Sequence, residues 1–339
     1  MTKRTLKHFA LSLALLGVVL SPFPSVAQVG RASKLPAKPV ASPRAQAASQ
    51  QTKTLGSPSY TFTLLNYPGT LSTAAICINK GASTSKTQIV GGYGSAPELN
   101  QAGFLARVSG KKTVTESYKS VSYPHEPAQQ VADCINDSGQ IVGVYVDASD
   151  AAHGYELSGG KFTTLDVPFT GAIGTYPFGI NNSGEVVGGW ADSDGNEHGF
   201  TLIGGTYASF DYPGGTETYA ADVNSEGDIV GDCYDSSGLL IGFLLSGETY
   251  TAIEYSGAVE TFASGINDAG DIVGGFCTTS ECEVNFDGEQ SFLLSGGVFM
   301  AIAIPGEVYT AVTDINNSGV VVGYYQDAAG LVGSFLATP

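Results

Sequence analysis

A single phrase recurs along this chain and constrains its fold more than any other feature. The clearest copy, at 180–190, reads INNSGEVVGGW, and four others read CINDSGQIVGVY, VNSEGDIVGDCY, INDAGDIVGGF and INNSGVVVGYY. A degraded copy with an insertion occupies 78–93 and brings the number to six. The motif asparagines are Asn79, Asn136, Asn181, Asn224, Asn267 and Asn316. Their spacing of 43 to 57 residues is typical of repeats that each form one four-stranded propeller blade.

The pattern inside one repeat predicts four short strands. In 218–257, apolar segments at 218–224, 228–234, 241–246 and 250–255 are separated by short polar segments that contain glycine. Valine, isoleucine, tyrosine and phenylalanine favour strands, and Asn and Gly tolerate the positive φ of tight hairpins. No sustained 3.6-residue apolar period supports a helix. The fold class is therefore all-β.

The ends of the chain predict how the repeats close. Six copies predict a six-bladed β-propeller with four-stranded blades, but the last copy lacks a fourth strand because the chain stops at Pro339. The segment 60–67, YTFTLLNY, matches a fourth strand and its linker. We expect this N-terminal strand to join the C-terminal blade, which hides two sheet edges. An open β-solenoid or β-sandwich array is the alternative, but it gains nothing from the displaced strand.

The N-terminal residues predict export. Residues 1–27 combine a basic start, a short apolar run and small residues before a cut near Ala27, as in a secretory signal peptide. Residues 28–58 are rich in Ala, Pro, Ser and Gln and contain no acidic residue, which predicts a disordered basic linker. The propeller domain then spans 59–339. We expect a secreted, periplasmic or cell-surface protein.

The charge of the domain excludes some partners. Between 59 and 339, seven Lys and Arg residues oppose all 32 Asp and Glu residues of the chain, giving a formal charge of −25. Such a surface repels phosphate backbones, so we expect no nucleic-acid partner. No apolar run is long enough to span a membrane. We expect a monomer.

The repeat unit as a whole resembles the bacterial extracellular HAF-repeat family, named for a His-Ala-Phe tripeptide. The matching residues are His153-Gly154-Tyr155 and His198-Gly199-Phe200, so the histidine is kept in two repeats and the central alanine in none. The resemblance covers 60–339 and implies export and a repeat fold. It implies no catalytic activity and supplies no site residues.

Ligand-binding candidates lie where loops and linkers share one face. Trp190, the only tryptophan, aligns with Tyr93, Tyr145, Tyr234, Phe276 and Tyr325 in the other copies. Trp190, Tyr145 and Tyr234 could stack on sugars, with His198 beside them, or the aromatic residues could fill the interfaces between blades. His125, His153 and His198 could bind a metal only if all three point to the channel, and a structural role in the repeat is the alternative.

Acidic residues give two further candidate sites. Asp192, Asp194 and Asn196 offer oxygen ligands for calcium, although a full EF-hand pattern is absent and the residues could simply serve the turn. Calcium apart, we expect no cofactor. Glu217, Glu260 and Glu307 lie in the interblade linkers, where paired carboxylates could hydrolyse a glycosidic bond or form a solvated rim.

Five cysteines in an exported chain permit disulfides. Cys277 and Cys282 lie in one loop and are the expected pair. Cys77 and Cys134 both stand two residues before a motif asparagine, and their pairing is left open by the sequence. Cys233 is left over.

The sequence therefore favours an exported, non-enzymatic propeller that binds a glycan, a protein or a cell-envelope ligand through its loop face. One alternative is a carbohydrate-active hydrolase or lyase that uses the linker carboxylates at the channel mouth. The other is a purely structural surface protein.

Overall fold

The computed structural model describes residues 59–81, 87–94, 102–109, 115–124, 129–279 and 289–339. The expected signal peptide and linker, together with His125 and Cys282, lie outside these ranges. Every element of the described ranges is a β-strand, so the all-β prediction is confirmed. The described part of the chain contains no helix with the length and hydropathy needed to cross a membrane.

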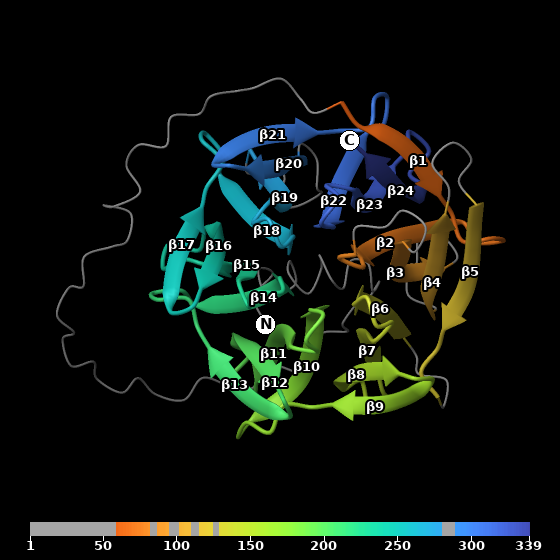
Figure 1. The fold of residues 1–339 in the computed structure, drawn as a ribbon. Helices are drawn as coiled ribbons and strands as arrows, with labels where there is room; N and C mark the ends of the chain where they lie inside the picture. Colours follow the sequence, from red (N-terminus) through yellow and green to blue (C-terminus); the bar gives the residue numbers. More distant parts are fainter. Residues whose placement is uncertain (1–58, 82–86, 95–101, 110–114, 125–128, 280–288) are drawn as a thin grey trace.

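The 24 strands fall into four classes by their position along the repeat (Figure 1). The inner strands are β2 (Ser72–Ile78), β6 (Gln129–Ile135), β10 (Ala172–Ile180), β14 (Glu217–Val223), β18 (Glu260–Ile266) and β22 (Tyr309–Ile315). The second strands are β3 (Thr87–Gly94), β7 (Ile141–Val146), β11 (Val186–Asp192), β15 (Ile229–Tyr234), β19 (Ile272–Cys277) and β23 (Val321–Gln326). The third strands are β4 (Ala102–Ser109), β8 (Ala152–Ser158), β12 (Glu197–Ile203), β16 (Leu240–Ser246), β20 (Glu289–Ser295) and β24 (Val332–Thr338). The outer strands are β5 (Thr115–Val121), β9 (Lys161–Leu165), β13 (Thr206–Phe210), β17 (Thr249–Ile253), β21 (Val298–Ile302) and β1 (Thr61–Leu65).

Consecutive strands pair antiparallel into four-stranded units. Four sheets contain one unit each, and the fifth sheet contains eight strands because a single parallel bridge between Gly174 and Ala152 joins two units. The unit β22-β23-β24 takes its outer strand from the other end of the chain: β1 pairs antiparallel with β24, with Thr61 opposite Thr338 and Leu65 opposite Ser334.

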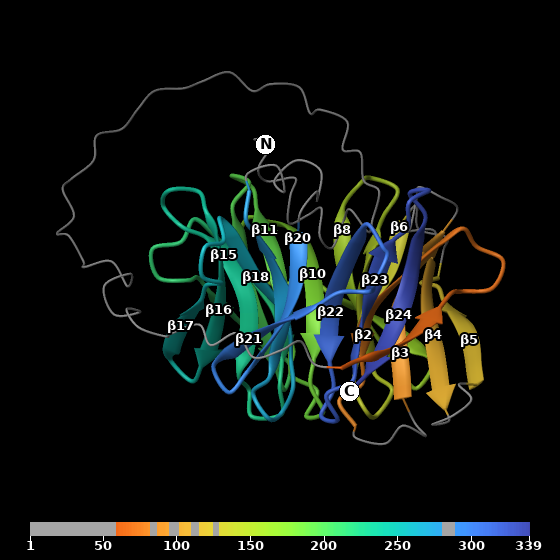
Figure 2. The same cartoon turned by 90° about the horizontal axis from the view of Figure 1, so that it is seen from above.

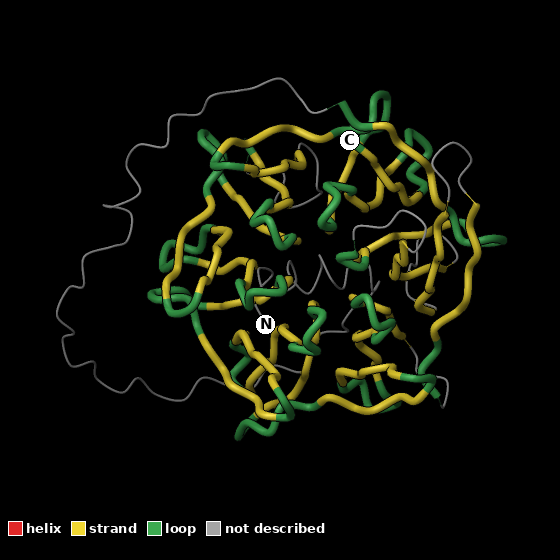
Figure 3. Tube along the Cα trace, viewed as in Figure 1, coloured by secondary structure: helices red, strands yellow, loops and turns green. Residues whose placement is uncertain are grey.

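The units are arranged as in a propeller. Figure 1 shows the inner strands directed toward a common centre and the outer strands around the rim. In Figure 2 the strands run between two faces that carry the connections, and Figure 3 shows these connections as loops throughout the described chain. One face carries the turns after the inner strands. The other carries the loops between second and third strands and the linkers between units, and we call it the loop face.

Glycine allows the inner and second strands to approach closely. A Cβ at Gly231 would overlap the carbonyl oxygen of Tyr219 on the inner strand, and the corresponding position of every second strand is also glycine. Opposite this glycine each inner strand carries a register shift, for example between Ala220 and Asp222. A bulge of this kind re-aims the following side chain, and here it sets which residues reach the centre.

Apolar side chains fill the spaces between neighbouring units. One such core joins Val273 and Leu293 to Val312, Val321 and Phe335 of the next unit, all buried. Each four-stranded sheet thus buries its faces against its neighbours.

Inner-strand side chains also fix the linkers on the loop face. In five units a threonine Oγ1 accepts a hydrogen bond from a linker N–H, at 2.9–3.1 Å. The threonines are Thr73, Thr175, Thr218, Thr261 and Thr310. Because this bond recurs, the loop face is held at a repeated geometry on which the candidate sites are built.

Candidate functional sites

The motif asparagine is a structural residue. Asn181 Oδ1 accepts hydrogen bonds from the N–H groups of Ser183 and Glu185 within its own turn, at 3.0 Å each. Its Nδ2 donates to the carbonyl oxygen of Asn224 in the next unit, at 2.9 Å. Asn136, Asn224 and Asn267 repeat the second bond to the following motif asparagine. The asparagines therefore cap their turns and link neighbouring units, which explains why each repeat keeps one.

The residue two positions before each motif asparagine lies at the centre of the molecule. These residues are Cys77, Cys134, Gly179, Asp222, Gly265 and Asp314. A Cβ at Gly179 would lie 2.8 Å from the Cα of Asp222, and one at Gly265 would lie 2.7 Å from Oδ1 of Asp314. Glycine at these two positions leaves room for the neighbouring aspartates.

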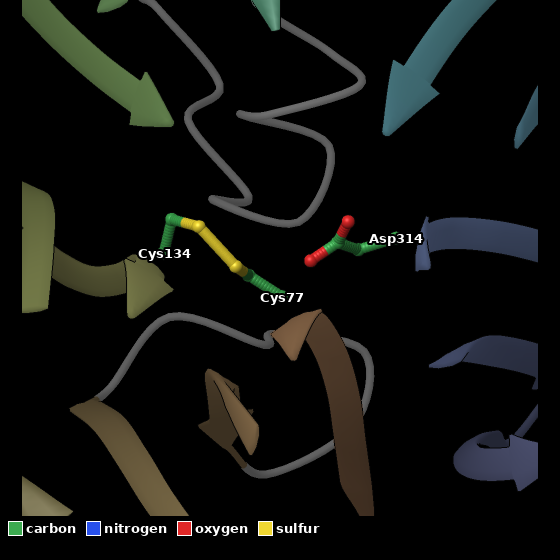
Figure 4. A group of neighbouring side chains, drawn as sticks. All are labelled: Cys77, Cys134 and Asp314. Atoms are coloured by element: carbon green, nitrogen blue, oxygen red, sulfur yellow. A yellow bond between two sulfur atoms is a disulfide. The ribbon is translucent and has the colours of Figure 1, made fainter. Parts of the chain in front are cut away.

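Cys77 and Cys134 form a disulfide between the first two inner strands, with a Cα–Cα distance of 4.9 Å. Figure 4 shows this disulfide facing Asp314. In the described part of the chain, these three residues are the one group of His, Cys, Asp or Glu donors close enough to share a metal ion. Both sulfurs are consumed by the disulfide, so in this state the group offers a metal only one carboxylate.

Lys80 is buried beside this group and binds two of the central carboxylates. Its Nζ donates to Asp222 Oδ2 at 2.7 Å, to Asp314 Oδ1 at 2.6 Å and to the carbonyl oxygen of Ile315 at 3.2 Å. The side chain comes from the turn after β2 and is 1% exposed. One cation is thus shared by two carboxylates that are far from it in sequence.

Lys80, Asp222 and Asp314 form a buried triad. Burial and charge act in opposite directions on the pKa values within it. Burial alone would lower the pKa of Lys80, but Asp222 and Asp314 raise it above its usual value. Burial raises the pKa of Asp314, Lys80 lowers it and the neighbouring Asp222 raises it again, so that it lies at about 7. One ammonium group stabilises only part of the negative charge of two carboxylates, so Asp314 titrates near neutral pH.

A cavity of about 120 Å³ lies between the inner strands, next to the triad. Its wall includes five buried carboxylates: Asp133, Asp222, Asp232, Glu289 and Asp314. Aromatic rings of Phe178, Tyr219, Phe262 and Tyr324 form much of the remaining wall. The repeat pattern did not predict this site. One signal was available: Lys80 follows the motif asparagine, where the other copies carry Asp, Asn or Ser.

His198 and two aspartates form a polar cluster on the loop face. His198 Nδ1 lies 2.9 Å from Asp211 Oδ1, and Nε2 lies 3.4 Å from Asp192 Oδ2. Its ring stacks on Trp190 with a centroid distance of 4.5 Å. The cluster is partly exposed, and the side chain of Asp211 is the most open of the three residues.

His153 forms a matching cluster in the preceding unit. Its Nδ1 lies 3.0 Å from Asp166 Oδ2, its Nε2 lies 3.5 Å from Asp147 Oδ2, and its ring stacks on Tyr145 at 5.1 Å. The two clusters occupy the same strand positions, because Tyr145 is opposite His153 and Trp190 is opposite His198. The sequence brought Trp190, Tyr145 and His198 to one face but did not predict their aspartate partners.

Trp190 and Tyr145 are covered on both sides. Trp190 lies between His198 and Phe169, which is 5.0 Å away, and its Nε1 donates to Ser209 Oγ at 2.9 Å. Tyr145 lies between His153 and Tyr123, which is 3.8 Å away. The rings fill interfaces in the structure, and a sugar would first meet the histidines and aspartates.

The alignment of Tyr234 with Trp190 is wrong. Thr175 is opposite Trp190, and the equivalent Thr218 is opposite Cys233. Tyr234 is therefore one position further along and packs in a buried cluster with Leu240 and Phe262. The spacing in the sequence agrees with the register, because Trp190 lies nine residues after Asn181 and Cys233 lies nine residues after Asn224.

The loop at 192–197 is held by its first aspartate. Asp192 Oδ1 accepts the N–H groups of Asp194 and Asn196, and Oδ2 accepts Asn196 Nδ2 at 2.8 Å. Partial burial opposes ionisation, but hydrogen bonds from Asn196, His198 and the Asp194 N–H bring the pKa of Asp192 down to about 2. Asp147, Asp235 and Asp327 hold their own loops in the same way. Both oxygens of Asp192 are therefore engaged in the turn.

The linker glutamates do not occupy equivalent positions. Glu217 and Glu260 begin β14 and β18, but Tyr309 begins β22, and Glu307 lies two residues earlier. The prediction that all three lie in interblade linkers is therefore wrong for Glu217 and Glu260, which belong to inner strands, and Glu307 lies in a linker. The structure places Glu197 near Glu217. Burial raises the pKa of Glu197 to about 8, and the negative charges of Glu217 and Asp192 contribute to this rise.

Cys233 and Cys277, the other described cysteines, lie in the second strands β15 and β19. Cys277 is disulfide-bonded, and its expected partner Cys282 lies outside the described residues. Cys233 is a free, buried thiol. Burial raises its pKa, and Asp232 and Asp235 add to the shift, so the thiolate is disfavoured.

Known structures share this fold at low sequence identity. A fucose-specific lectin from Aleuria aurantia matches with a TM-score of 0.50 and 12% identity, over 78% of this chain and 91% of that one. AofleA from Arthrobotrys oligospora, in a mutant form, matches with a TM-score of 0.50 and 12% identity, over 82% and 86% of the two chains. A further Aleuria aurantia lectin structure, 11% identical, is described as a six-bladed β-propeller. No protein-family model and no curated protein matches the chain. At these identities the likeness establishes a propeller-like fold.

Proposed function

We propose that the mature chain is an exported, non-enzymatic six-bladed β-propeller that binds a glycan through its loop face. The observation that carries the proposal is the pair of matching clusters around His153 and His198. Each presents an imidazole and two partly exposed carboxylates on the loop face of adjacent units.

Polar clusters of this kind suit a ligand with many hydroxyl groups. A carboxylate accepts hydrogen bonds at about four lone-pair sites, and such charge-assisted bonds are the stronger ones. Asp166 and Asp211 are among the more open residues of the clusters. Two copies in adjacent units favour a branched or repeating glycan, because linked sites raise avidity.

The fold supports the same class of ligand. The Aleuria aurantia protein with this fold is a fucose-specific lectin, so fucosides are the first compounds to test. The sequence identity is too low to transfer its site residues.

A glycan array probed with the labelled mature chain tests the proposal. We expect binding to at least one glycan class, and Asp166→Asn with Asp211→Asn should weaken it about tenfold to a hundredfold, the value of losing charged hydrogen bonds. Glu248→Gln is the matched control, because Glu248 is exposed in the β16–β17 turn on the opposite face. A blank array at high protein concentration would count against the proposal, as would full retention of binding by the double variant.

The ring closure is part of the proposal. The pairing of β1 with β24 supports a ring of six blades closed by the N-terminal strand. Deleting 59–67 should expose an unpaired edge on β24 and cause association. Size-exclusion chromatography should show a monomer for the mature chain and larger species for the deletion. A deletion variant as monomeric and stable as the parent would contradict closure by this strand.

A hydrolase is the second candidate, and one observation favours it. Glu197 carries a pKa raised to about 8 by burial and lies near Glu217, which adds to the shift. Glycosidases use one protonated carboxyl and one carboxylate. Turnover of polysaccharides that is abolished by both Glu197→Gln and Glu217→Gln would support this activity. A complete absence of turnover across neutral and acidic polysaccharides would exclude it.

A further inference from the structure

The central cavity has no role in the glycan proposal, and its chemistry points to a different ligand. We propose that it binds a small organic cation with a primary ammonium group. The ligand would enter between the inner strands and place its ammonium against Asp133.

The cavity gathers several buried carboxyl groups. Five of them line it, and the described lining residues include no Lys or Arg. Lys80 approaches from beside the cavity and binds Asp222 and Asp314. Asp133, Asp232 and Glu289 remain outside that triad.

Asp133 and Asp222, which both line the cavity, each have one buried carboxylate oxygen without a donor. Asp133 is 2% exposed, and in the described structure its Oδ2 has no hydrogen-bond partner. Asp222 Oδ1 is likewise without a partner there, while Asp222 Oδ2 accepts Lys80 and the Ile266 N–H. A buried carboxylate oxygen without a donor is costly. An ammonium group supplies three donors and one compensating charge.

Asp133 is placed there by the bulge of β6. The register shifts between Ala132 and Cys134, so Asp133 has no partner residue on β7. Burial raises the pKa of Asp133 well above its usual range, although the backbone N–H of Val144 lowers it. A bound cation would favour the charged form, so binding and ionisation support each other.

The rest of the wall selects an organic cation over a metal ion. Hard metal ions require several converging oxygen ligands, but among the described residues the donors converge only at Cys77, Cys134 and Asp314. The first two of these are joined as a disulfide. The aromatic residues Phe178 and Tyr324 also line the cavity, and aromatic side chains suit an alkylammonium through apolar and cation–π contacts.

The volume limits the size of the ligand. A cavity of about 150 Å³ can hold benzene, which has six heavy atoms, so the cavity of about 120 Å³ suits a molecule of roughly four or five heavy atoms. Propylammonium has this size and is the probe.

Isothermal titration calorimetry on the full mature chain tests the inference, with propylammonium chloride against 1-propanol and sodium chloride at equal concentration. We expect a saturable one-to-one isotherm for propylammonium only. Asp133→Asn, which keeps the shape and removes the charge, should weaken binding at least tenfold. Glu248→Gln should leave binding unchanged.

Three results would overturn the inference. These are equal heats from 1-propanol, unchanged affinity in folded Asp133→Asn, or displacement of propylammonium by stoichiometric calcium. Ala221→Val is a second variant, because Ala221 lines the cavity and a larger side chain there should also reduce binding. Neither variant touches the His153 and His198 clusters, so failure here is distinguishable from failure of the glycan proposal.

Discussion

Replacing Lys80 with methionine should destabilise the protein strongly and in a pH-dependent manner. The substitution keeps the aliphatic stem but removes the one ammonium shared by Asp222 and Asp314, at 2.7 and 2.6 Å. Removing one partner of a buried ion pair typically costs about 3–5 kcal/mol, because the remaining charges are left uncompensated. We expect a loss in this range at pH 8.5.

The loss should be smaller at pH 5. The pKa of Asp314 lies at about 7 even with Lys80 present, so at pH 5 this carboxyl is protonated and one negative charge fewer is left without a partner. The folded-state pKa of Asp314 lies above the unfolded value, so the folded state holds more protons between about pH 4 and 7. Stability from this group is present at low pH and is lost as the pH rises through that window.

Urea unfolding followed by the fluorescence of Trp190, the only tryptophan, measures the effect. Trp190 is buried, so its emission should shift to the red on unfolding. Lys161→Met is the control, because Lys161 is exposed at the start of β9, and we expect a change within about 0.5 kcal/mol. The triple variant with Asp222→Asn and Asp314→Asn should recover much of the loss. A loss below about 1 kcal/mol at pH 8.5, or one equal at both pH values, would refute the reasoning.

Three further measurements test other parts of the structure. Glu197→Gln should stabilise the protein at pH 8.5 and flatten the fall in stability between about pH 5 and 8, because the raised pKa of Glu197 makes its ionisation unfavourable in the folded state; an unchanged urea midpoint at pH 8.5 would contradict this. Replacing Cys77 and Cys134 with serine should lower the free energy of unfolding by about 2–4 kcal/mol, since the disulfide closes a sequence separation of 57 residues, and an unaltered urea midpoint would show that it contributes nothing. Millimolar calcium should leave the melting temperature unchanged, because both oxygens of Asp192 already accept hydrogen bonds in its turn; a rise in Tm would instead reveal a calcium site.

The repeat could be recognised from the sequence because its pattern is contained within each copy. Each copy contains its own strands, its turn asparagine and its glycines within about 45 residues, and local hydrophobic alternation predicts strands. The all-β class and the propeller-like arrangement followed from that period. The prediction that Trp190, Tyr145 and His198 lie on one face followed from their fixed positions within the repeat.

Strand register corrects the positions of several predicted site residues. The strand pairing gives the position of Trp190 to Cys233 and not to Tyr234, in agreement with the spacing from the motif asparagines. Glu217 and Glu260 begin inner strands, whereas Glu307 lies in a linker. A shift of one residue moves a side chain to the other face of a sheet, so Tyr234 packs in a buried cluster with Leu240 and Phe262.

The sequence by itself determined the unit: four strands, a capped turn and a loop face, repeated along the chain. The tertiary structure alone decided what meets at the centre. Lys80 reaches Asp222 and Asp314 across 142 and 234 residues of sequence, and Cys77 meets Cys134 across 57. These contacts depend on how many units surround the axis and on the bulge that aims each inner strand. The repeat period determines neither the number of units around the axis nor the direction in which each bulge aims its side chain. Both arise only when all units pack around a common axis.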